Sequence, residues 1–221
     1  MIVGIVFDMD GILVDTEKYW QQARIAFAES IGKPWTVDDQ RNLMGSSTLE
    51  WAAYMKRQLE IETSLDDIIH EIKGRLLPYY EANLPIMPGA VAAVQLTAQH
   101  YPIALASGSA PWAIDAIMRI TGLGPYFKVQ VSADEVGRGK PAPDVFLEAA
   151  RRLGIPPTQM LGIEDSGNGI RSLKAANMKA IAVPTPELPL APEVEAMADV
   201  VLTSLESFDL PLIHRLDQSS P

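Results

Sequence analysis

The chain opens with a short unbroken run of hydrophobic residues. Ile2-Val3-Gly4-Ile5-Val6-Phe7 is followed directly by Asp8. An apolar run of this length that ends in a polar turn is typical of a strand buried on both faces. We therefore predict a strand over residues 2–8.

A helical pattern follows from residue 17 to about residue 82, where apolar residues recur at intervals of three and four. Breaks divide this stretch into four predicted helices, and they lie at Gly32-Lys33-Pro34, Gly45-Ser46-Ser47 and Thr63-Ser64. The candidate N-cap residues are Thr16, Thr36, Ser47 and Ser64. Trp51, Tyr54 and Met55 share helical spacing, and we interpret them as core of this region rather than as a substrate platform.

After Pro88, short apolar runs alternate with helical segments. The predicted strands are 103–106, 128–132, 160–163, 180–183 and 199–202, and the predicted helices are 90–100, 111–121, 143–153 and 166–177. Strands joined by helices form a parallel sheet with helices on both faces. We predict an α/β fold: a Rossmann-like core of residues 1–15 and 84–213, a four-helix domain of residues 16–83 inserted after the first strand, and a disordered tail of residues 214–221.

Composition and charge narrow the class of protein. Of 221 residues, 48% are hydrophobic and 21% are charged, as in a globular protein. The net charge of −10 argues against binding to nucleic acid or to an anionic membrane, since the Lys and Arg residues are scattered. The lack of cysteine excludes disulfides, thiol catalysis and Cys-ligated zinc, so any metal is expected to have oxygen ligands.

The sequence has no pattern typical of export or of a membrane span. The first apolar run is interrupted at Asp8 and lacks a basic leader, and no segment approaches the roughly 20 apolar residues of a transmembrane helix. We expect a soluble cytoplasmic protein. His70, His100 and His214 lie near no other candidate group, which argues against Ser-His-Asp hydrolysis.

Two carboxylates follow the first predicted strand. Asp8 and Asp10 would turn toward one side if strand geometry continued past Phe7, and Gly11 would then allow a sharp turn close to a ligand. A phosphoryl-transfer site can use one such acid as nucleophile and the other as proton carrier. A solvated acidic turn is the alternative.

Two further predicted strands are followed by groups that could bind an anion. Ser107-Gly108-Ser109 offers hydroxyl and backbone N–H groups before the helix that begins at Pro111, although a Ser N-cap explains this equally well. Lys140-Pro141-Ala142-Pro143 holds one lysine in a stiff segment, where it can neutralise a phosphate or steady an aspartate. The alternative for Lys140 is a solvated surface group.

Glu164 and Asp165 end another predicted strand, just before a helix start at Ser166. Acids at a helix N-terminus can simply complement the helix dipole. Together with Asp8 and Asp10, however, they place four carboxyl groups at neighbouring strand ends, where open parallel sheets bind their ligands. These groups repel one another unless a hard cation is bound, so we predict Mg²⁺.

Four motifs in fixed order connect the chain to a known family. They are Asp8-Met9-Asp10-Gly11-Ile12-Leu13-Val14-Asp15-Thr16-Glu17, Ala106-Ser107-Gly108-Ser109, Lys140-Pro141-Ala142-Pro143-Asp144 and Gly162-Ile163-Glu164-Asp165-Ser166. Over nearly its whole length the chain resembles the haloacid dehalogenase superfamily, and within it the branch of β-phosphoglucomutase-like enzymes and sugar-phosphate phosphatases.

The resemblance implies a role for each motif. Asp8 would be the nucleophile that becomes an aspartyl phosphate, and Asp10 would be the general acid and base. The phosphoryl group would be held by Ser107, Gly108 and Lys140. Mg²⁺ would be bound by Asp8, Asp165 and the backbone carbonyl of Asp10, with Glu164 assisting directly or through water.

The helical region of residues 16–83 resembles the cap of that family, which closes over the site and selects the substrate. Gly45, Ser46 and Ser47 would form its specificity loop, and a helix–helix turn with Ser47 as N-cap is the alternative. β-Phosphoglucomutase-like enzymes carry an arginine in this loop, and this chain has serines instead. Lys73 or Arg75 could take over that function, unless both are ordinary solvated side chains.

The sequence therefore predicts a Mg²⁺-dependent phosphatase of a small phosphorylated metabolite, a sugar phosphate, that acts through an aspartyl phosphate. A β-phosphoglucomutase-like phosphomutase is the rival, and a non-enzymatic phospho-acceptor domain is a remote third reading, against which the helical insert and Asp10 argue. We expect no nucleic-acid or membrane partner, and a monomer or weak homodimer.

Overall fold

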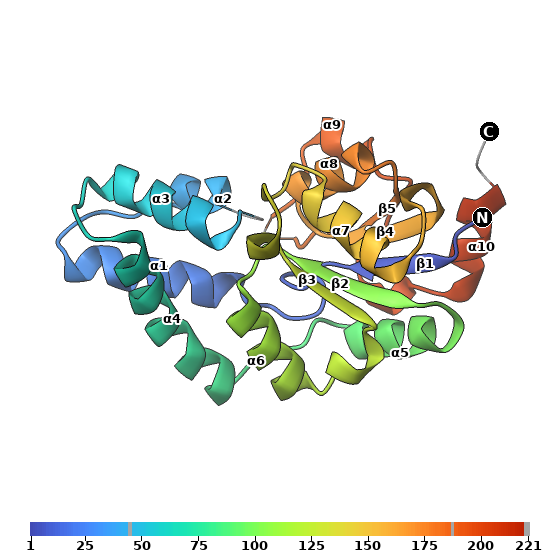
Figure 1. The fold of residues 1–221 in the computed structure, drawn as a ribbon, viewed down its shortest axis with the longest axis horizontal. Coiled ribbons are helices and arrows are strands. Elements are labelled where there is room, and N and C mark those ends of the chain that lie inside the picture. The colour runs from blue at the N-terminus through green and yellow to red at the C-terminus, as the bar shows by residue number, and fades with distance from the viewer. Residues whose placement is uncertain (44–45, 187, 219–221) are drawn as a thin grey trace.

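A parallel sheet covered by helices forms the larger part of the molecule, on the right of Figure 1. The computed structural model describes residues 1–43, 46–186 and 188–218. It contains a six-stranded sheet in the order β3-β2-β1-β4-β5-β6, in which each neighbouring pair is parallel. The strands are β1 (Gly4–Phe7), β2 (Ile103–Ser107), β3 (Val129–Ser132), β4 (Met160–Glu164), β5 (Lys179–Ala182) and β6 (Val200–Val201). The predicted α/β fold is confirmed, with strand boundaries that differ by one or two residues.

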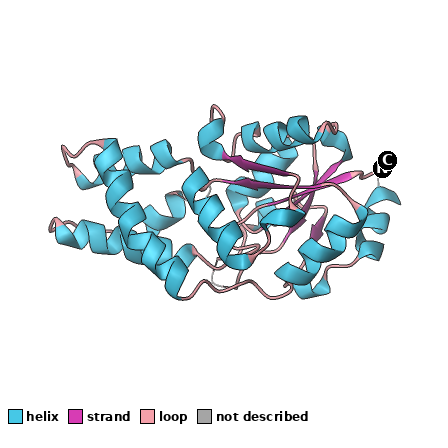
Figure 2. Ribbon diagram, turned by 60° about the horizontal axis from the view of Figure 1, so that its bottom comes forward, coloured by secondary structure: helices cyan, strands magenta, loops and turns pink. Residues whose placement is uncertain are grey.

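Helices cover both faces of the sheet (Figures 1 and 2). One face packs against α5 (Ala90–His100), α6 (Pro111–Thr121) and α10 (Leu210–Gln218), and the other against α7 (Asp144–Leu153), α8 (Gly167–Ala175) and α9 (Pro192–Glu195). Short 3₁₀ helices lie at Gly124–Tyr126, Ala133–Glu135, Pro157–Gln159 and Leu205–Ser207. Ile5 and Phe7 belong to the first layer and Val6 to the second, which is why β1 is an unbroken apolar run.

The four helices expected between the first and second strands are present. They are α1 (Glu17–Ser30), α2 (Val37–Asn42), α3 (Thr48–Leu59) and α4 (Leu65–Ala82), and they lie together beyond one end of the sheet (Figure 1). Their apolar faces meet in a core that includes Phe27, Met55, Leu59 and Leu76. We call α1–α4 the helical insert.

Three of the four candidate N-cap residues cap a helix. Ser64 Oγ accepts a hydrogen bond from the backbone N–H of Asp67 at 3.1 Å, and Thr36 Oγ1 accepts one from the backbone N–H of Asp39 at 3.2 Å. Ser47 belongs to a capping box, in which its own backbone N–H donates to the carboxylate of Glu50 at 2.8 Å. Thr16 is the exception, because its side chain makes no capping bond and its hydroxyl donates to the carboxylate of Asp10. Its predicted capping function is therefore wrong, since the hydroxyl is turned away from α1.

The predicted disorder of the C-terminal tail is wrong for residues 214–218. Helix α10 continues to Gln218, because Leu212, Ile213 and Leu216 form an apolar face that packs into the core. The backbone N–H of Ile2 donates to Asp217 at 2.5 Å, which ties this helix to the start of the chain. Residues 219–221 lie outside the described part of the structure.

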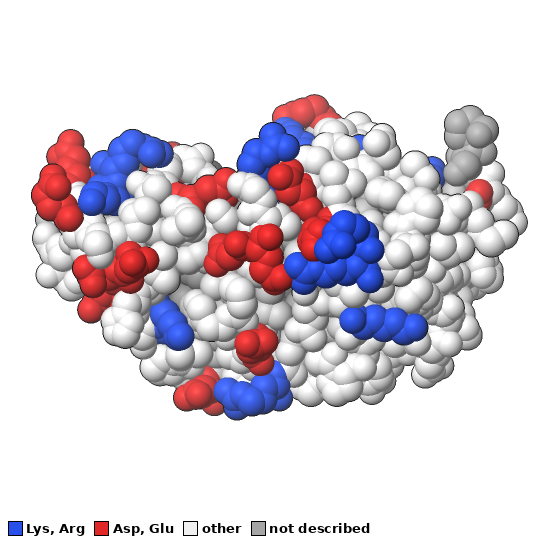
Figure 3. Space-filling model, in the orientation of Figure 1, with Lys and Arg blue, Asp and Glu red and all other residues white. Residues whose placement is uncertain are grey.

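Acidic and basic side chains are intermixed on the face of the molecule shown in Figure 3. This agrees with the scattered distribution of Lys and Arg along the sequence. Among the helices that the structure describes, none has both the length and the apolar character needed to cross a membrane.

Candidate active site

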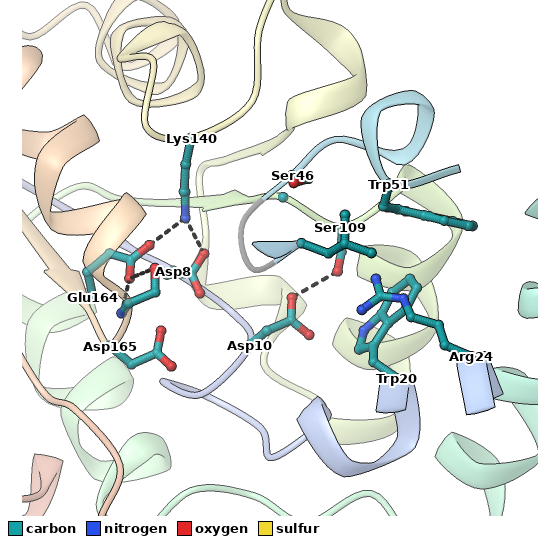
Figure 4. Close-up of a pocket in the computed structure, with 13 residues that line it drawn as sticks. Asp8, Asp10, Trp20, Arg24, Ser46, Trp51, Ser109, Lys140, Glu164 and Asp165 are labelled. Atoms are coloured by element: carbon teal, nitrogen blue, oxygen red, sulfur yellow. Dashed lines mark hydrogen bonds and ion pairs between the residues drawn. The ribbon is translucent and has the colours of Figure 1, made fainter. Parts of the chain in front are cut away.

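The strand order brings four polar loops together. β3, β2, β1 and β4 are consecutive in the sheet, so the segments at their carboxyl ends are neighbours. These segments carry Asp8, Asp10, Ser107, Ser109, Lys140, Glu164 and Asp165. A cavity of about 70 Å³ lies between them and the helical insert (Figure 4).

Asp8 is positioned by the strand before it and by Lys140. Its backbone N–H donates to the carbonyl of Ile163 at 3.0 Å, and its carboxylate accepts a hydrogen bond from Lys140 Nζ at 2.5 Å. Both side chains are buried. Burial raises the pKa of Asp8 to about 8, because a carboxyl group removed from water favours its neutral form. The positive charge of Lys140 acts in the opposite direction and lowers this pKa.

Asp8, Glu164 and Asp165 form a buried cluster in which one oxygen of each lies within 4.8 Å of the others. Lys140 Nζ also donates to Glu164 at 2.7 Å. Burial alone would lower the pKa of Lys140, but the negative charges of Asp8 and Glu164 raise it above its usual value. Burial raises the pKa of Asp165 well above its usual value. One lysine cannot balance three carboxylates, so this cluster needs a proton or a further cation.

The cluster suits a hard divalent cation. Carboxylate oxygens are the ligands that Mg²⁺ prefers in proteins, and a dication supplies the missing positive charge. Gly11 lets the loop after β1 pass beside the cluster, because its φ is +83° and a Cβ at this position would lie 2.1 Å from Asp165 Oδ2. The carboxylate of Asp10 is not part of this cluster. The predicted contribution of Asp10 to Mg²⁺ binding therefore concerns its backbone carbonyl.

Asp10 faces hydroxyl groups rather than a lysine. Its carboxylate accepts hydrogen bonds from Ser109 Oγ at 2.8 Å, from Ser107 Oγ at 3.1 Å and from Thr16 Oγ1. β1 ends at Phe7, so the strand geometry that would align the two carboxylates does not continue. Asp8 and Asp10 nevertheless line one cavity, with different partners (Figure 4).

The segment after β2 is divided between a buried residue and two that line the cavity. Ser107 is fully buried, and its Oγ accepts a hydrogen bond from the backbone N–H of Ser109 at 2.9 Å. Gly108 and Ser109 lie on the cavity wall. Ser109 therefore lines the cavity and also contacts Asp10, although the sequence analysis assigned it no role of its own.

Residues of the helical insert close the cavity on the opposite side. Trp20 and Arg24 come from α1 and Trp51 from α3, and all three are buried. The two indole rings are 5.8 Å apart between centroids, and the guanidinium carbon of Arg24 lies 4.7 Å from the Trp20 ring centre. Trp51 was expected to be core alone, but it also lines the cavity, whereas Met55 is core.

The predicted specificity loop reaches the cavity in part. Ser46 lines it, together with Leu43. Ser47 caps α3, since its backbone N–H donates to Glu50 at 2.8 Å, as the alternative interpretation of this loop had it. Gly45 lies outside the residues that the structure describes.

The two cationic candidates on α4 do not reach the described wall of the cavity. Arg75 forms an ion pair with Glu71 one turn earlier and lies over the ring of Phe27. Lys73 Nζ lies 5.3 Å from the ring centre of Trp112 on α6. The structure therefore does not bring Arg75 or Lys73 to the position that the sequence reasoning considered for them.

Sequence reasoning missed Arg24. It follows Trp20 by one helical turn and so lies on the apolar face of α1 with Ala23, Phe27 and Ala28. A charged residue on such a face was the available signal, because burying an arginine without a partner is costly.

The helical insert also contacts the loop that carries Lys140. The backbone N–H of Thr48 donates to Asp134 at 2.7 Å, and the backbone N–H of Gly139 donates to Glu50 at 3.4 Å. The first turn of α3 is thus attached to the segment just before Lys140.

Comparison with known proteins agrees with the geometry. The family model of haloacid dehalogenase-like hydrolases matches residues 2–177. Hexitol phosphatase B of Escherichia coli (strain K12) is 33% identical over 211 residues, covering 92% of this chain and 93% of that protein. A phosphorylated carbohydrates phosphatase of Thermotoga maritima is 34% identical over 182 residues, covering 80% and 83%.

A solved structure shares the fold. The β-phosphoglucomutase of Clostridium difficile matches with a TM-score of 0.85, covering 97% of this chain and 96% of that one, at 24% identity. Together with the family match and the phosphatase relatives, this confirms the resemblance seen in the motifs: the chain belongs to the haloacid dehalogenase-like hydrolases and is a phosphoric monoester hydrolase.

Proposed function

We propose that this phosphatase hydrolyses a small phosphorylated metabolite, a sugar phosphate, through an aspartyl-phosphate intermediate and with the help of Mg²⁺. One observation carries the proposal: Asp8 pairs with Lys140, Asp10 accepts hydrogen bonds from hydroxyls, and both line the same cavity. Two relatives are named for phosphorylated hexitols and carbohydrates, which supports the substrate class.

The reaction assigned to these residues has two steps. An oxygen of Asp8 attacks phosphorus, the bond from phosphorus to the ester oxygen breaks, and protonated Asp10 gives its proton to the leaving oxygen. Asp10 then takes a proton from a water molecule as that water attacks phosphorus, and the bond between phosphorus and Asp8 breaks. Inorganic phosphate is released and both acids return to their starting states.

The phosphoryl group needs positive charge and hydrogen-bond donors more than it needs further covalent chemistry. Lys140 and Gly108 line the cavity and are assigned to hold it. Ser107 remains a candidate for the same role, although its hydroxyl would have to exchange Asp10 for a phosphoryl oxygen. Ser109 and Thr16 are assigned to orient Asp10, to which both donate hydrogen bonds.

The acid cluster provides the ligands for Mg²⁺. We assign Asp8, Asp165 and the backbone carbonyl of Asp10 to hold it, with Glu164 contributing directly or through water. When bound, the ion supplies positive charge that offsets the charge on the phosphoryl oxygens.

We assign residues 16–83 as a cap domain over a core formed by residues 1–15 and 84–213. The contacts of Thr48 with Asp134 and of Glu50 with Gly139 support this, because they attach the helical insert to the core beside the cavity. A cap that closes here excludes water and limits the site to compact substrates. We further propose that the protein is cytoplasmic and acts as a monomer or weak homodimer. We propose no nucleic-acid or membrane partner, in line with the net charge of −10.

A panel of phosphorylated sugars, polyols and sugar acids, assayed for inorganic phosphate with and without Mg²⁺, tests the proposal. We expect Mg²⁺-dependent release of phosphate from at least one small ester. If no ester in the panel releases phosphate, the assigned substrate class is wrong. A hexose 1-phosphate separates hydrolysis from phosphomutase chemistry, since accumulation of the 6-phosphate without inorganic phosphate would identify a mutase.

A further inference from the structure

Arg24 is the one charged side chain on the described wall of the cavity that comes from the helical insert. Its exposed fraction is 5%, and its Nε is buried without a hydrogen-bond partner among the described residues. The contacts of its guanidinium are with two rings, at 4.7 Å from the centre of Trp20 and 5.7 Å from that of Trp51. In Figure 4 the guanidinium lies over Trp20, on the side of the cavity away from Lys140.

A buried guanidinium in this state lacks the groups that normally compensate for its loss of water. It has five N–H donors in one plane, a geometry that matches a carboxylate or a phosphate. An indole ring attracts a cation through its face but accepts none of these in-plane hydrogen bonds. The two tryptophans therefore hold Arg24 in place without satisfying its donors.

The acidic neighbours of Arg24 are already hydrogen-bonded elsewhere. Glu17 accepts a hydrogen bond from Gln40 at 2.8 Å, and Asp10 accepts from the hydroxyls of Ser109 and Ser107. Burial lowers the pKa of Arg24 to about 10 in spite of attraction by Glu17 and Asp10. The protein itself thus leaves the positive charge of Arg24 partly uncompensated.

We propose that Arg24 binds a second oxyanion on the substrate, a carboxylate or a phosphate at the end away from the group that is hydrolysed. This inference rests on the proposed function and narrows its substrate class to sugar acids or sugars that carry two anionic groups. The reacting phosphoryl group lies at the strand ends with Lys140, and the second anion lies between α1 and α3, where Trp20 and Trp51 shield it from water. Neutral polyol phosphates leave Arg24 without a partner.

Matched pairs of substrates test this directly. 6-Phosphogluconate and glucitol 6-phosphate differ by a carboxylate in place of a hydroxymethyl group at the far end, as do 3-phosphoglycerate and glycerol 3-phosphate. Fructose 1,6-bisphosphate and fructose 6-phosphate form the arm for a second phosphate. We expect the wild type to favour the acidic member of at least one pair by about tenfold or more in kcat/KM, and the preferred arm identifies the anion.

Variants connect that preference to Arg24. Arg24→Gln should lower kcat/KM for the acidic member by about 10- to 100-fold, while the neutral member changes by less than about threefold. Arg24→Lys keeps the charge and should retain part of the preference. Arg57→Gln is the matched control, since Arg57 also lies over an aromatic ring, that of Tyr54, on an exposed face of the helical insert, and it should change neither value.

A binding measurement separates this inference from the proposed function. Without Mg²⁺, calorimetric titration of the wild type should show tighter binding of the acidic member of a pair. This measurement needs neither turnover nor a folded variant. Equal affinity within every pair, or equal loss for both members in Arg24→Gln, would overturn the assignment of Arg24. If no phosphate is released from any substrate but the acidic members still bind more tightly, the proposed hydrolysis fails while the assignment of Arg24 stands.

Discussion

The two walls of the cavity differ in how they are built. The strand-end wall carries Asp8, Asp10, Lys140, Glu164 and Asp165; Lys140 contacts Asp8 and Glu164, and Asp10 accepts a hydrogen bond from Ser109. The described part of the insert wall carries Trp20, Arg24, Leu43, Ser46 and Trp51, and among these residues Arg24 is the cation, beside two aromatic rings. Chemistry common to all phosphate esters is therefore assigned to the first wall, and discrimination among esters to the second.

Substitutions in the two walls are expected to affect activity in different ways. A change in the strand-end wall should slow the reaction of every substrate, because all of them present the same phosphoryl group. A change in the insert wall should alter the ranking of substrates and leave the reaction itself in place. The variants below test this division, from the largest expected effect to the smallest.

Asp8→Asn removes the assigned nucleophile. We expect turnover to fall by more than about 10⁴-fold for every substrate, since the loss of a nucleophile removes the reaction path itself. The melting temperature without metal should stay the same or rise, because one of three buried carboxyl groups that share a single lysine is replaced by a neutral amide, and Lys140 keeps Glu164 as a partner. Asp115→Asn, at an exposed position on α6, is the matched control. Mg²⁺-dependent turnover that survives in Asp8→Asn would contradict the assignment.

Asp10→Asn removes the assigned proton carrier. We expect kcat for a sugar phosphate to fall by about 10²- to 10⁴-fold, which is the usual contribution of general acid–base catalysis. 4-Nitrophenyl phosphate has a leaving group that needs no proton, so this variant should release a burst of nitrophenol and then turn over slowly. Rapid-quench or stopped-flow measurement detects the burst. Equal losses for both substrates, with no burst, would contradict the two-step role of Asp10.

The strand-end wall should make stability depend on pH and on metal. The pKa of Asp8 is about 8 in the folded chain and about 3.9 when unfolded, so the folded state holds a proton that unfolding releases. Its stabilising contribution is complete below the unfolded value and is lost as pH rises toward about 8, and the raised pKa of Asp165 acts in the same direction. In EDTA, the melting temperature should therefore fall between about pH 5 and about pH 8.

Mg²⁺ should reverse this loss, because a bound cation takes the place of the proton. Saturation at about 100 times Kd corresponds to about 2.7 kcal/mol of stabilisation, which differential scanning fluorimetry resolves. Asp165→Asn should reduce the effect of Mg²⁺ on the melting temperature. A Mg²⁺ effect that is larger near pH 5 than near pH 8 would exclude this coupling.

Gly139→Ala disturbs the contact between the two walls. A Cβ at this position would lie 2.4 Å from Glu50 Oε2 and 2.9 Å from the backbone nitrogen of Ser47, so α3 must move away from the loop that carries Lys140. We expect kcat/KM to fall by about tenfold for all substrates through poorer alignment of the two walls. Gly137→Ala is the control, since its Cβ would meet one atom at 3.4 Å. Equal effects of the two variants would disprove a specific contact.

The sequence predicted the sheet and the strand-end wall well, and the reason is local. Each residue of that wall lies at the end of a strand or in the loop that follows it, and the carboxyl ends of parallel strands meet at one edge. The structure brings Asp8, Lys140 and Glu164 into contact accordingly. Their roles in catalysis and metal binding stay predictions until the variants above are measured.

The insert wall could not be predicted in the same way. Helical periodicity finds the buried face of α1, but it does not say which part of that face meets the sheet and which part meets a cavity. Arg75 looked available in the sequence, yet it pairs with Glu71 on its own helix, whereas Arg24 looked like an interruption of an apolar face and lines the cavity. The end of helix α10 was missed because Leu216 is the one apolar residue between Ile213 and Gln218, and packing against the core decides its structure.

The attachment of α3 to the segment between Asp134 and Gly139 has a consequence for protein engineering. A helical insert taken from a relative and placed between residues 15 and 84 would lack the loop that contacts its own third helix. The contacts of α3 with Asp134 and Gly139, in the segment just before Lys140, would then be lost. The exchangeable unit is therefore discontinuous and includes residues 134–139 together with the insert. Chimaeras built on this larger unit should keep the reaction while they acquire the donor's selectivity.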